Sequence, residues 1–370
     1  MPRSHYFFAG GGTGGHIYPG LAVAEQIRKN QPEAHITFFC SRRPIDSRIL
    51  SKAGFDFIPL PVKSFSLRPD KLVVFCAALL QSYNLAKEKI TPFVSRSIVI
   101  GSGGFASAPA VFAAGKLNVP VAMLNVDILP GRANKLLAGF AKEIFVQFED
   151  TARHFAKTKA VVSVTGCPLR KGFGHPDRTG VIDELELDEN KKSVLITGAS
   201  SGAMNINNAV CALLGNLEEF ADDWQIVHIT GKSDYERVSG GYTNAKISHK
   251  ILDYYDDMPG LLAAANLVVG RAGAVSVAEY AAAGTAAICL PYPYHKDKHQ
   301  YLNAGKLVEA GAAVVVDDLA GDIERTSKNL CEQLMTLMKD DERRGRMARC
   351  GQASAKLDAA ERIAQAIMRL

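Results

Sequence analysis

Five glycines in six positions precede a single histidine near the start of the chain, in the stretch FFAGGGTGGHIYPG from Phe7 to Gly20. Glycines between a strand and a helix leave backbone N–H groups uncovered, and the helix N-terminus attracts anions. The same positive end disfavours an imidazolium ion, so His16 is expected to stay neutral and able to accept a proton. The stretch predicts a phosphate-facing turn with a general base. In the structural alternative, the glycines only permit tight packing and the ring caps the turn.

Two familiar nucleotide-binding patterns fit this turn poorly. Gly10, Gly12 and Gly15 match G-x-G-x-x-G, but the second strand ends in ITFFCSRRPID, which has no carboxylate before Asp46 to bind a ribose. The arginines in that stretch leave open an NADP-dependent reductase. A P-loop requires lysine after the last glycine, where this chain has His16.

The turn must be positioned by a sheet of parallel strands, because short apolar runs alternate with amphipathic helical patterns such as Gly20–Asn30. Expected strands lie at 5–9, 35–40, 55–60, 97–101, 120–124, 143–146 and 161–165, and then at 193–197, 224–230, 267–270, 286–290 and 313–316. The fold class is therefore α/β.

A second domain is predicted because the pattern starts again. KKSVLITGASSGAMNINNAV repeats the order strand, glycine-rich turn and helix that opens the chain. We expect domains at 1–165 and 193–350, a linker at 166–192, and a C-terminal helix within 351–370 that packs back across the interface. Ligands of open α/β sheets bind at the carboxyl ends of the strands, so a cleft between two such sheets is expected.

Charge is distributed unevenly along the chain of 370 residues, whose net charge is +5. Residues 1–165 hold 20 lysines and arginines against 10 acidic residues, and residues 166–370 hold 23 against 28. A basic first half suits a phosphorylated substrate or an anionic membrane. Its basic residues are dispersed, so nucleic acid is not expected. Seven cysteines without a C-x-x-C pair indicate a reducing compartment, and no signal peptide or transmembrane helix is expected.

Three stretches together carry a close resemblance to a known family. They are GGGTGGHIYPGLAVAEQI, IGSGGFASAPAVFAAGKLNVPV and NLVVGRAGAVSVAEYAAAGTAAICLPYPYHKDKHQYLNAGKLVEAGAA. In this order they resemble the MurG-type UDP-N-acetylglucosamine:lipid-linked muramyl-pentapeptide N-acetylglucosaminyltransferases of glycosyltransferase family 28. The resemblance implies a GT-B fold, with two Rossmann-like domains and the donor bound mainly by the second.

This family implies an inverting transfer of GlcNAc from UDP-GlcNAc to the C4 hydroxyl of lipid I, giving lipid II for peptidoglycan synthesis. The implied partners are UDP-GlcNAc, the undecaprenyl-linked muramyl-pentapeptide and an anionic membrane surface. The implied location is the cytoplasmic face of the plasma (inner) membrane, as a peripheral protein. No cofactor and no metal are expected, which agrees with the absence of a D-x-D motif at a strand end.

The resemblance also assigns roles to residues of the first domain. Thr13, Gly14 and Gly15 approach the donor diphosphate and sugar, and His16 is the catalytic base. The second glycine turn, GSGGFAS, is expected on the acceptor side. The acceptor and its pyrophosphate are assigned to Gly103, Gly104, Ser107, Asn125 and Asn134.

Residues of the second domain are expected to bind the donor. Ser200 in TGASSGA is matched to a phosphate contact, and Arg170 in TGCPLR to a donor contact near the domain boundary. Tyr255 is matched to a residue whose backbone meets uracil, and Gln300 to one that contacts the sugar. The helix start AVSVAE supplies N–H groups for phosphate and a carboxylate for the ribose, through Ala274, Val275, Ser276, Val277, Ala278 and Glu279.

The chain departs from the family pattern after the fifth strand. Where H-E-Q-N is typical, this chain reads LNVD, so Asn125 replaces a glutamate and Asp127 stands where an asparagine contacts the sugar. Asp127 would raise the pKa of His16 if both line the site. A typical Gln-Gln pair likewise reads His299-Gln300. Two alternatives therefore stay open: a UDP-GlcNAc 2-epimerase with the same two-domain plan, and a non-catalytic nucleotide-sugar or lipid-binding relative.

A basic and apolar segment follows the third strand. Lys63, Arg68 and Lys71 stand beside a helical pattern that contains Leu72, Val73, Phe75, Leu79 and Leu80. Such a helix is expected either to lie on anionic lipid or to bury its apolar face in the core.

Overall fold

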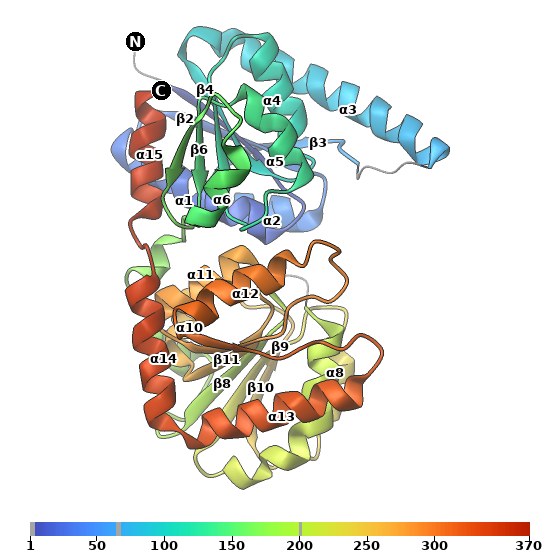
Figure 1. Ribbon diagram of the computed structural model, residues 1–370, viewed down its shortest axis with the longest axis vertical. Helices are drawn as coiled ribbons and strands as arrows, with labels where there is room; N and C mark the ends of the chain where they lie inside the picture. Colours follow the sequence, from blue (N-terminus) through green and yellow to red (C-terminus); the bar gives the residue numbers. More distant parts are fainter. Residues whose placement is uncertain (1–3, 64–67, 200–201) are drawn as a thin grey trace. The chain divides into compact units, whose positions relative to one another are not determined.

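Two parallel sheets, each within its own compact unit, make up the computed structural model of the protein, which describes residues 4–63, 68–199 and 202–370 (Figure 1). One unit contains the chain up to Arg170 together with Lys356–Leu370, and the other contains Lys171–Ala355. The first unit thus ends inside the segment expected to be a linker. The predicted α/β class with parallel strands is confirmed.

The first unit is built on a seven-stranded sheet in the order β3-β2-β1-β4-β5-β6-β7, with every neighbouring pair parallel. Its strands are β1 (His5–Gly10), β2 (His35–Ser41), β3 (Asp56–Leu60), β4 (Ser97–Gly103), β5 (Val121–Asn125), β6 (Glu143–Val146) and β7 (Val161–Val164). Its helices are α1 (Gly14–Asn30), α2 (Pro44–Lys52), α3 (Pro69–Ile90), α4 (Ser107–Lys116), α5 (Arg132–Leu137), α6 (Glu149–Ala152) and α15 (Ala359–Arg369), with 3-10 turns η1 (Thr91–Arg96), η2 (Ala138–Phe140) and η3 (Arg153–Phe155).

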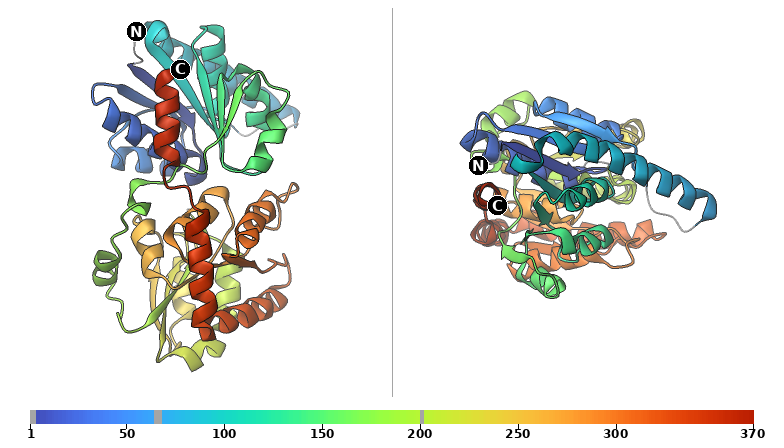
Figure 2. Two further views of the ribbon diagram at one scale, coloured as in Figure 1. Left: turned by 60° about the vertical axis from the view of Figure 1, so that its left-hand side comes forward. Right: turned by 90° about the horizontal axis from the view of Figure 1, so that it is seen from above.

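Both faces of this sheet are covered, which explains why its central strands are largely apolar and buried. Along β1, Tyr6 and Phe8 pack into one cluster with α1 and α15, while Phe7 and Ala9 pack into another with α3 and α4. This alternation follows from the two-residue period of a strand. The C-terminal helix α15 packs against α1 in the same unit, beside its sheet (Figure 2).

The second unit is built on a six-stranded parallel sheet in the order β10-β9-β8-β11-β12-β13. Its strands are β8 (Lys192–Thr197), β9 (Trp224–Ile229), β10 (Ser248–Leu252), β11 (Leu267–Gly270), β12 (Ala286–Cys289) and β13 (Ala313–Val315). Its helices are α7 (Arg178–Glu184), α8 (Met204–Leu213), α9 (Tyr235–Gly241), α10 (Met258–Ala264), α11 (Ala274–Ala283), α12 (His299–Glu309), α13 (Ile323–Lys339) and α14 (Asp341–Ser354), with 3-10 turns η4 (Lys171–Phe173) and η6 (Leu214–Phe220).

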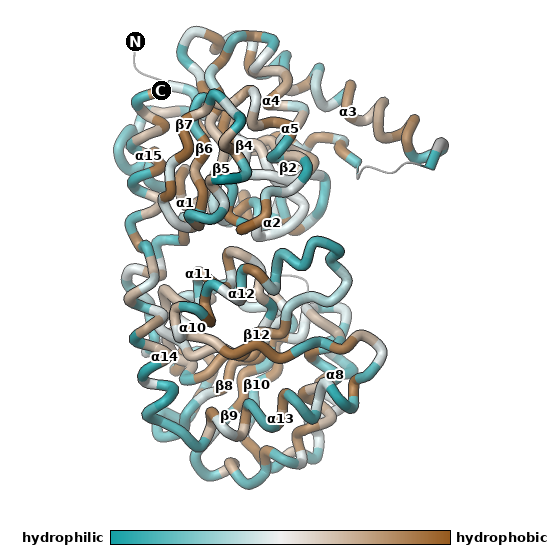
Figure 3. The backbone as a smooth tube through the Cα atoms, in the orientation of Figure 1, coloured by the Kyte–Doolittle hydropathy of each residue, from teal (hydrophilic) through white to brown (hydrophobic). Residues whose placement is uncertain are grey.

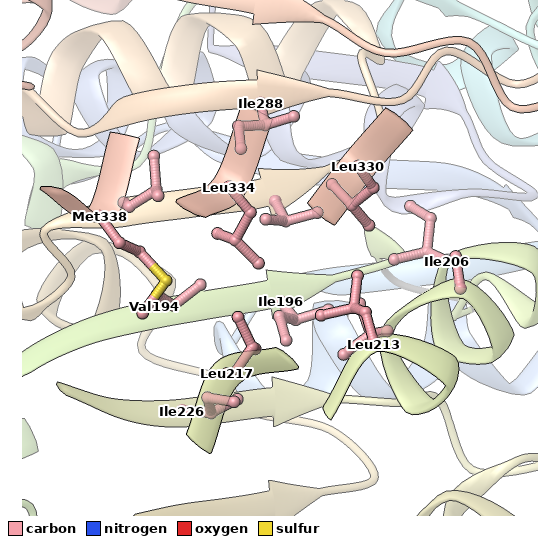
Figure 4. Packing of buried hydrophobic residues seen from close by; sticks show 14 of the residues in the cluster. Val194, Ile196, Ile206, Leu213, Leu217, Ile226, Ile288, Leu330, Leu334 and Met338 are labelled. Atoms are coloured by element: carbon pink, nitrogen blue, oxygen red, sulfur yellow. The ribbon is translucent and has the colours of Figure 1, made fainter. Parts of the chain in front are cut away.

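One face of the second sheet packs against α8 and α13. Leu330, Leu334 and Met338 of α13 meet strand residues such as Ile196 and Ile288 in one buried cluster (Figure 4). Strand β10, which the sequence analysis missed, lies at the edge of this sheet, and its residues SHKIL are all exposed or half-buried. Its polar composition reflects that edge position.

Helix α3 differs from the other helices of the first unit. Its N-terminal half extends away from the sheet, as the views of Figures 1 and 2 agree, while the helix packs on α4. Apolar side chains of this half and of the middle of the helix are exposed: Val73 at 71%, Val74 at 53% and Leu80 at 61%. The alternative that this apolar face is simply core is wrong for Val73 and Leu80, which belong to the predicted face. Apolar residues recur along the projecting part (Figure 3). Within the described ranges, no helix is both long and apolar enough to cross a bilayer.

Candidate active site

The two glycine turns of the first unit lie side by side because of the strand order. Strands β1 and β4 are neighbours, with β2 and β3 on one side of them and β5 to β7 on the other. The chain order therefore reverses between β1 and β4, and such a switch point is where open α/β sheets bind ligands. The turn after β1 leads to His16, and the turn after β4 carries Gly103 and Gly104.

The first turn passes directly into helix α1. Thr13 is the N-cap, with extended backbone angles, and Gly14 is already helical. Gly12 has a φ of +91°, a conformation that favours glycine. The helix thus begins earlier than the amphipathic pattern indicated, and Pro19 lies in its second turn. Gly14, Gly15 and His16 are the first residues of a long helix, as the phosphate-facing interpretation requires.

The hydrogen bonds of the His16 ring define its tautomer. Its Nδ1 lies 3.3 Å from the Gly11 carbonyl oxygen and 3.3 Å from the Thr13 hydroxyl. A carbonyl oxygen only accepts hydrogen bonds, so we assign the ring proton to Nδ1. The Nε2 atom of the neutral ring then carries the lone pair that can accept a proton.

The pKa of His16 is lowered from its ordinary value, so the ring is neutral at pH 7. Burial is the main cause, because an imidazolium ion loses hydration there. The Asp127 carboxylate opposes this by raising the pKa, as predicted, and the bond to the Gly11 carbonyl and the charge of Asp46 raise it further. The direction agrees with the sequence analysis, but the leading cause is burial rather than the helix dipole that we invoked.

The second glycine turn packs directly against the His16 ring. A Cβ added to Gly104 would lie 3.1 Å from Nδ1 of His16 and 2.8 Å from the Gly11 oxygen, and one added to Gly103 would lie 3.2 Å from Cδ2 of the ring. Both glycines have positive φ, +96° at Gly103 and +74° at Gly104. The glycines of the second turn are thus required twice, by their backbone conformation and by the close approach of the imidazole.

Two serines hold the turns together from inside. Ser102 donates to the His16 carbonyl oxygen at 2.7 Å, and the Ser107 hydroxyl lies 2.6 Å from both the Ala9 and Gly103 carbonyl oxygens. We expected Ser107 to contact the acceptor. Its side chain is instead completely buried and bonded to the backbone, so it braces the turns.

The residues after β5 form a short hydrogen-bonded chain. Asn125, only 2% exposed, donates to the Asp127 carbonyl oxygen at 2.8 Å and accepts from Asn134 at 2.8 Å. Asn125 therefore supports its neighbours and does not present its amide to solvent. The Oδ1 atom of Asn134 is buried without a hydrogen-bond partner within the described residues, and it lies near Gly103. Asp127 is half-buried.

Arg170, the last residue of the first unit, lies with its guanidinium carbon 4.2 Å from the centroid of the Tyr18 ring. Tyr18 follows His16 by two positions in α1. The structure thus brings Arg170 to the helix that carries the histidine. Arg43, which suggested an NADP phosphate contact, donates to the Gly12 carbonyl oxygen at 2.6 Å and so serves the turn itself.

The second unit repeats the switch point between β8 and β11. The glycine turn after β8 contains Gly202, with a φ of +73°, where a Cβ would lie 2.3 Å from the Thr230 carbonyl oxygen. Ser200 of this turn, expected to bind phosphate, lies outside the described residues.

Helix α11 begins next to that turn, after the N-cap Gly273. The residues expected to bind the donor with their backbone, Ala274, Val275, Ser276, Val277 and Ala278, are its first residues and are buried or half-buried. Glu279 is 9% exposed, so it is not an ordinary surface carboxylate of a helix.

A buried ion pair supports this end of the second sheet, and the sequence analysis missed it. Arg271 donates to Asp318 at 2.7 Å and to the Leu290 carbonyl oxygen at 3.0 Å, and Asp318 also accepts from Asn205 at 2.8 Å. The pair links the loops after β11, β12 and β13 to the start of α8. An arginine between glycines in an apolar stretch, VVGRAGAV, was the available signal.

The remaining predicted donor residues lie in the second unit, one at the start of a helix and one after a strand. Gln300, at the start of α12, accepts from the Tyr292 backbone N–H at 2.9 Å, and its neighbour His299 lies 2.8 Å from Asp297. Tyr255 follows β10, and its hydroxyl donates to Glu184 at 2.8 Å. Burial and this carboxylate raise the pKa of Tyr255. Among the residues that the structure describes, no group of three or more His, Cys, Asp or Glu side chains is arranged to hold a metal ion.

Comparison of the sequence with family models gives two matches that together span most of the chain. The N-terminal domain of glycosyltransferase family 28 matches residues 6–146, and its C-terminal domain matches residues 193–363. A protein of Halothermothrix orenii is 36% identical over 360 residues, covering 94% of both chains, and one of Lactiplantibacillus plantarum is 33% identical over 361 residues, covering 96% of both. Both are named UDP-N-acetylglucosamine–N-acetylmuramyl-(pentapeptide) pyrophosphoryl-undecaprenol N-acetylglucosamine transferase.

Solved structures show the same fold. MurG of Acinetobacter baumannii aligns over the whole of both chains with a TM-score of 0.74 at 24% identity. A UDP-GlcNAc 2-epimerase of Neisseria meningitidis bound to UDP-GlcNAc aligns over 99% of both chains with a TM-score of 0.72 at 14% identity. The fold alone therefore does not separate transferase from epimerase. The sequence relatives do, and the chain belongs to the MurG-type N-acetylglucosaminyltransferases of glycosyltransferase family 28, with the GT-B fold.

Proposed function

We propose that this protein transfers GlcNAc from UDP-GlcNAc to the muramyl C4 hydroxyl of lipid I and so forms lipid II for peptidoglycan synthesis. The proposal is supported by the names of its relatives and by one structural observation. His16 lies between two glycine turns at a switch point of the sheet, and burial keeps its ring neutral. Its Nδ1 is bonded to the Gly11 carbonyl, so the unprotonated Nε2 is the atom that can accept a proton.

The chemistry follows from that ring. His16 Nε2 accepts the hydroxyl proton while the C4 oxygen attacks the anomeric carbon of GlcNAc, and UDP leaves from the opposite face, which inverts that centre. The proton that leaves the alcohol remains on His16, whose Nδ1–H stays bonded to Gly11. Asp127 stabilises the imidazolium that forms, because its charge already raises the pKa of His16.

The leaving diphosphate needs positive potential. We propose that this potential comes from Arg170, the Ser200 hydroxyl, the N–H groups of Thr13 to Gly15 and the first turn of α11. Glu279 accepts from the ribose hydroxyls, the backbone at Tyr255 meets uracil, and Gln300 and Asp127 contact the sugar. On the acceptor side, Gly103, Gly104 and Asn134 approach the pyrophosphate. Asn125 and Ser107 position these groups from behind. The proposed transfer uses these charges and dipoles and requires no metal.

The test is transfer of labelled GlcNAc from UDP-GlcNAc to a short-chain lipid I analogue, with EDTA present. His16→Ala should lower kcat by about 10² to 10⁴-fold, the usual effect of losing a general base. UDP-GlcNAc binding should change little. His154→Ala is the matched control, because His154 is exposed and lies in the same unit. Near-normal turnover of the His16 variant would exclude the assignment, and conversion of UDP-GlcNAc without acceptor would identify an epimerase.

We further propose that the projecting half of α3 binds the cytoplasmic face of the plasma membrane, where the polyprenyl acceptor resides. The exposed side chains of Val73, Val74 and Leu80 supply apolar area. Lys63, exposed before this helix, and Lys71, exposed in its first turn, supply positive charge. Such a surface binds anionic lipid by both contributions.

Vesicle binding of the purified protein tests this surface. Removing about 1.5 kcal/mol of apolar transfer energy with Leu80→Ser should weaken binding to anionic vesicles about tenfold. Val161→Ser is the control, because Val161 is 63% exposed on β7. Raising the salt concentration should weaken binding of the parent protein, and binding that is insensitive to salt would contradict the electrostatic part. Equal binding by both variants would contradict the assignment of α3.

A further inference from the structure

A carboxylate that the proposed mechanism does not use is buried beneath the first glycine turn. Asp46, in the first turn of α2, is completely buried. Its Oδ2 accepts from the Ser41 backbone N–H at 2.9 Å and from the Ser41 hydroxyl at 2.6 Å, and its two oxygens lie 3.1 and 2.9 Å from the Gly12 nitrogen. Burial of a carboxylate is costly unless such donors replace its water. All of these donors belong to the end of β2 or to the glycine turn.

The bond from Gly12 to Asp46 has a partner at the other end of the same peptide group. The Gly12 N–H and the Gly11 carbonyl belong to one peptide unit. The N–H donates to Asp46, and the carbonyl oxygen accepts from His16 Nδ1 at 3.3 Å. The Asp46 carboxylate, the Gly11–Gly12 peptide and the His16 imidazole therefore form one hydrogen-bonded chain. An anion at the N–H end polarises a peptide and makes its oxygen a stronger acceptor.

This peptide cannot turn away from that arrangement. A Cβ on Gly11 would lie 2.4 Å from Oδ2 of Asp46 and 2.9 Å from the Ser41 nitrogen, so the turn lies directly against the carboxylate. Gly104 closes the other side, since a Cβ there would lie 2.8 Å from the Gly11 oxygen. The next carbonyl, of Gly12, accepts from Arg43. The orientation of the Gly11–Gly12 peptide is thus fixed by its neighbours on every side that the structure describes.

We propose that Asp46 is a positioning residue for the transfer reaction, joined to His16 through the Gly11–Gly12 peptide. Through this peptide, Asp46 keeps the His16 proton on Nδ1 and so leaves Nε2 unprotonated. It also stabilises the positive charge that forms when His16 takes the acceptor proton. Its role corresponds to that of the aspartate in a Ser-His-Asp triad, with one peptide unit inserted. This inference rests on the proposed function of His16 as the base.

Two carboxylates act on this ring and one arginine binds the turn beside it, and their effects must be separated experimentally. Asp127 acts from the loop after β5, and Asp46 acts from α2, and both raise the pKa of His16. Arg43 is the N-cap residue of α2 and binds the turn through its guanidinium. Asp46→Asn removes the relayed charge and retains Asp127 and Arg43. Ser41→Ala is the matched control, because it removes one hydrogen bond to Asp46 and keeps the carboxylate.

Nitrogen NMR of the full-length protein labelled in histidine, without substrates, tests the relay directly. His16→Gln assigns the signal. We expect the Nδ1–H tautomer in the parent protein and in Ser41→Ala. In Asp46→Asn we expect a shift toward the Nε2–H tautomer and titration at lower pH. An Nε2–H tautomer in the parent protein would overturn the inference, even if Asp46→Asn does not fold. An unchanged tautomer and titration in a folded Asp46→Asn would overturn it as well.

Kinetics add a second readout. Asp46→Asn should lower kcat by roughly tenfold to a hundredfold, below the loss seen when a directly bonded aspartate is replaced, and should leave KM for UDP-GlcNAc unchanged. The acid limb of its pH–rate profile should move to lower pH, and Asp46→Glu should recover part of the rate. A fall in kcat with an unmoved acid limb would mean a structural role only. If the parent protein transfers no GlcNAc while the NMR result holds, the proposed function fails and the relay stands.

Discussion

Gly104→Ala is expected to displace His16, the proposed catalytic base, without changing its chemistry. The added methyl carbon would lie 2.8 Å from the Gly11 carbonyl oxygen and 3.1 Å from His16 Nδ1. The oxygen belongs to the backbone and must move by a few tenths of an ångström, because a relaxed carbon–oxygen contact is longer. That oxygen is also the acceptor of the His16 ring. The substitution therefore loosens the one bond that sets the tautomer.

The size of the effect can be estimated from two contributions. A non-glycine residue at the observed φ of +74° costs about 1–2 kcal/mol. Weakening the bond from His16 to Gly11 costs about 0.5–1.5 kcal/mol more. The sum, about 1.5–3.5 kcal/mol, should lower the melting temperature of the first unit by roughly 3–14 °C. Displacing the base by a fraction of an ångström should lower kcat by roughly ten- to a hundredfold.

Two other glycines of the same unit separate these contributions. Gly54 has a φ of +66° and no atom within 4 Å of an added Cβ, so Gly54→Ala carries the backbone cost alone. Gly139 has neither the positive φ nor the close contact, so Gly139→Ala should be nearly silent. The assays are thermal unfolding and GlcNAc transfer. If Gly104→Ala is no less stable than Gly54→Ala and keeps its kcat, the close approach of the second turn to His16 has no energetic consequence, and the reasoning fails.

Three further predictions concern the second unit. Glu279→Gln should weaken UDP-GlcNAc binding about ten- to a hundredfold by calorimetry, because a charge-assisted bond to a hydroxyl is worth about 1.5–3 kcal/mol; unchanged affinity would contradict its assignment to the ribose. Asp318→Asn should destabilise the unit by about 3–5 kcal/mol in urea unfolding, since it leaves Arg271 buried without its counter-ion. Burial lowers the pKa of His228 to about 3 in the folded protein, whereas its ordinary pKa is 6.5. Between these two pH values the unfolded state therefore binds one proton more than the folded state. Stability should therefore fall by about 1.4 kcal/mol per pH unit as pH drops through that window, and His228→Gln should remove this slope.

The fold was largely predictable because the central strands of both sheets are buried on two faces. Continuous apolar runs such as VLIT before the third glycine turn leave no alternative but a buried strand. Strand β10 escaped prediction because it lies at an edge, where polar residues are tolerated. The start of α1 was placed too late because glycine and proline have low helix propensity, which weakens the helical pattern in the sequence. In the structure, packing against the sheet and the second turn stabilises the helix at these positions.

The candidate site was predictable where its chemistry lies within one motif. His16 and both glycine turns stand in contiguous stretches, so their relation to strand ends can be read locally. Asp46 and Arg271 could not be found in this way, because each acts on a loop that a different strand brings to it. Their signal was only indirect: single charges in stretches that must otherwise be buried. Ser107 was misjudged for a related reason, since burial decides whether a hydroxyl faces a ligand or a carbonyl.

The departure LNVD exchanges the places of a carboxylate and an amide relative to the family pattern H-E-Q-N. Asn125 is 2% exposed, and both ends of its amide are used, as donor to the Asp127 carbonyl and as acceptor from Asn134. A carboxylate at 125 could serve only as an acceptor, and it would face a carbonyl oxygen without a proton between them. In this chain a carboxylate is therefore tolerated at position 127, where the side chain is half-buried, and is disfavoured at position 125.

Asn125→Glu should accordingly destabilise the first unit by about 2–4 kcal/mol in thermal or urea unfolding, the cost of a buried and incompletely bonded carboxylate. Asp127→Asn should leave stability nearly unchanged and act on the base instead. Because the Asp127 charge raises the pKa of His16, its removal should move the acid limb of kcat to lower pH and lower the plateau. Full stability of Asn125→Glu would show that the hydrogen bonds of Asn125 do not exclude a carboxylate from position 125. An unmoved acid limb in Asp127→Asn would show that the charge at position 127 does not act on His16.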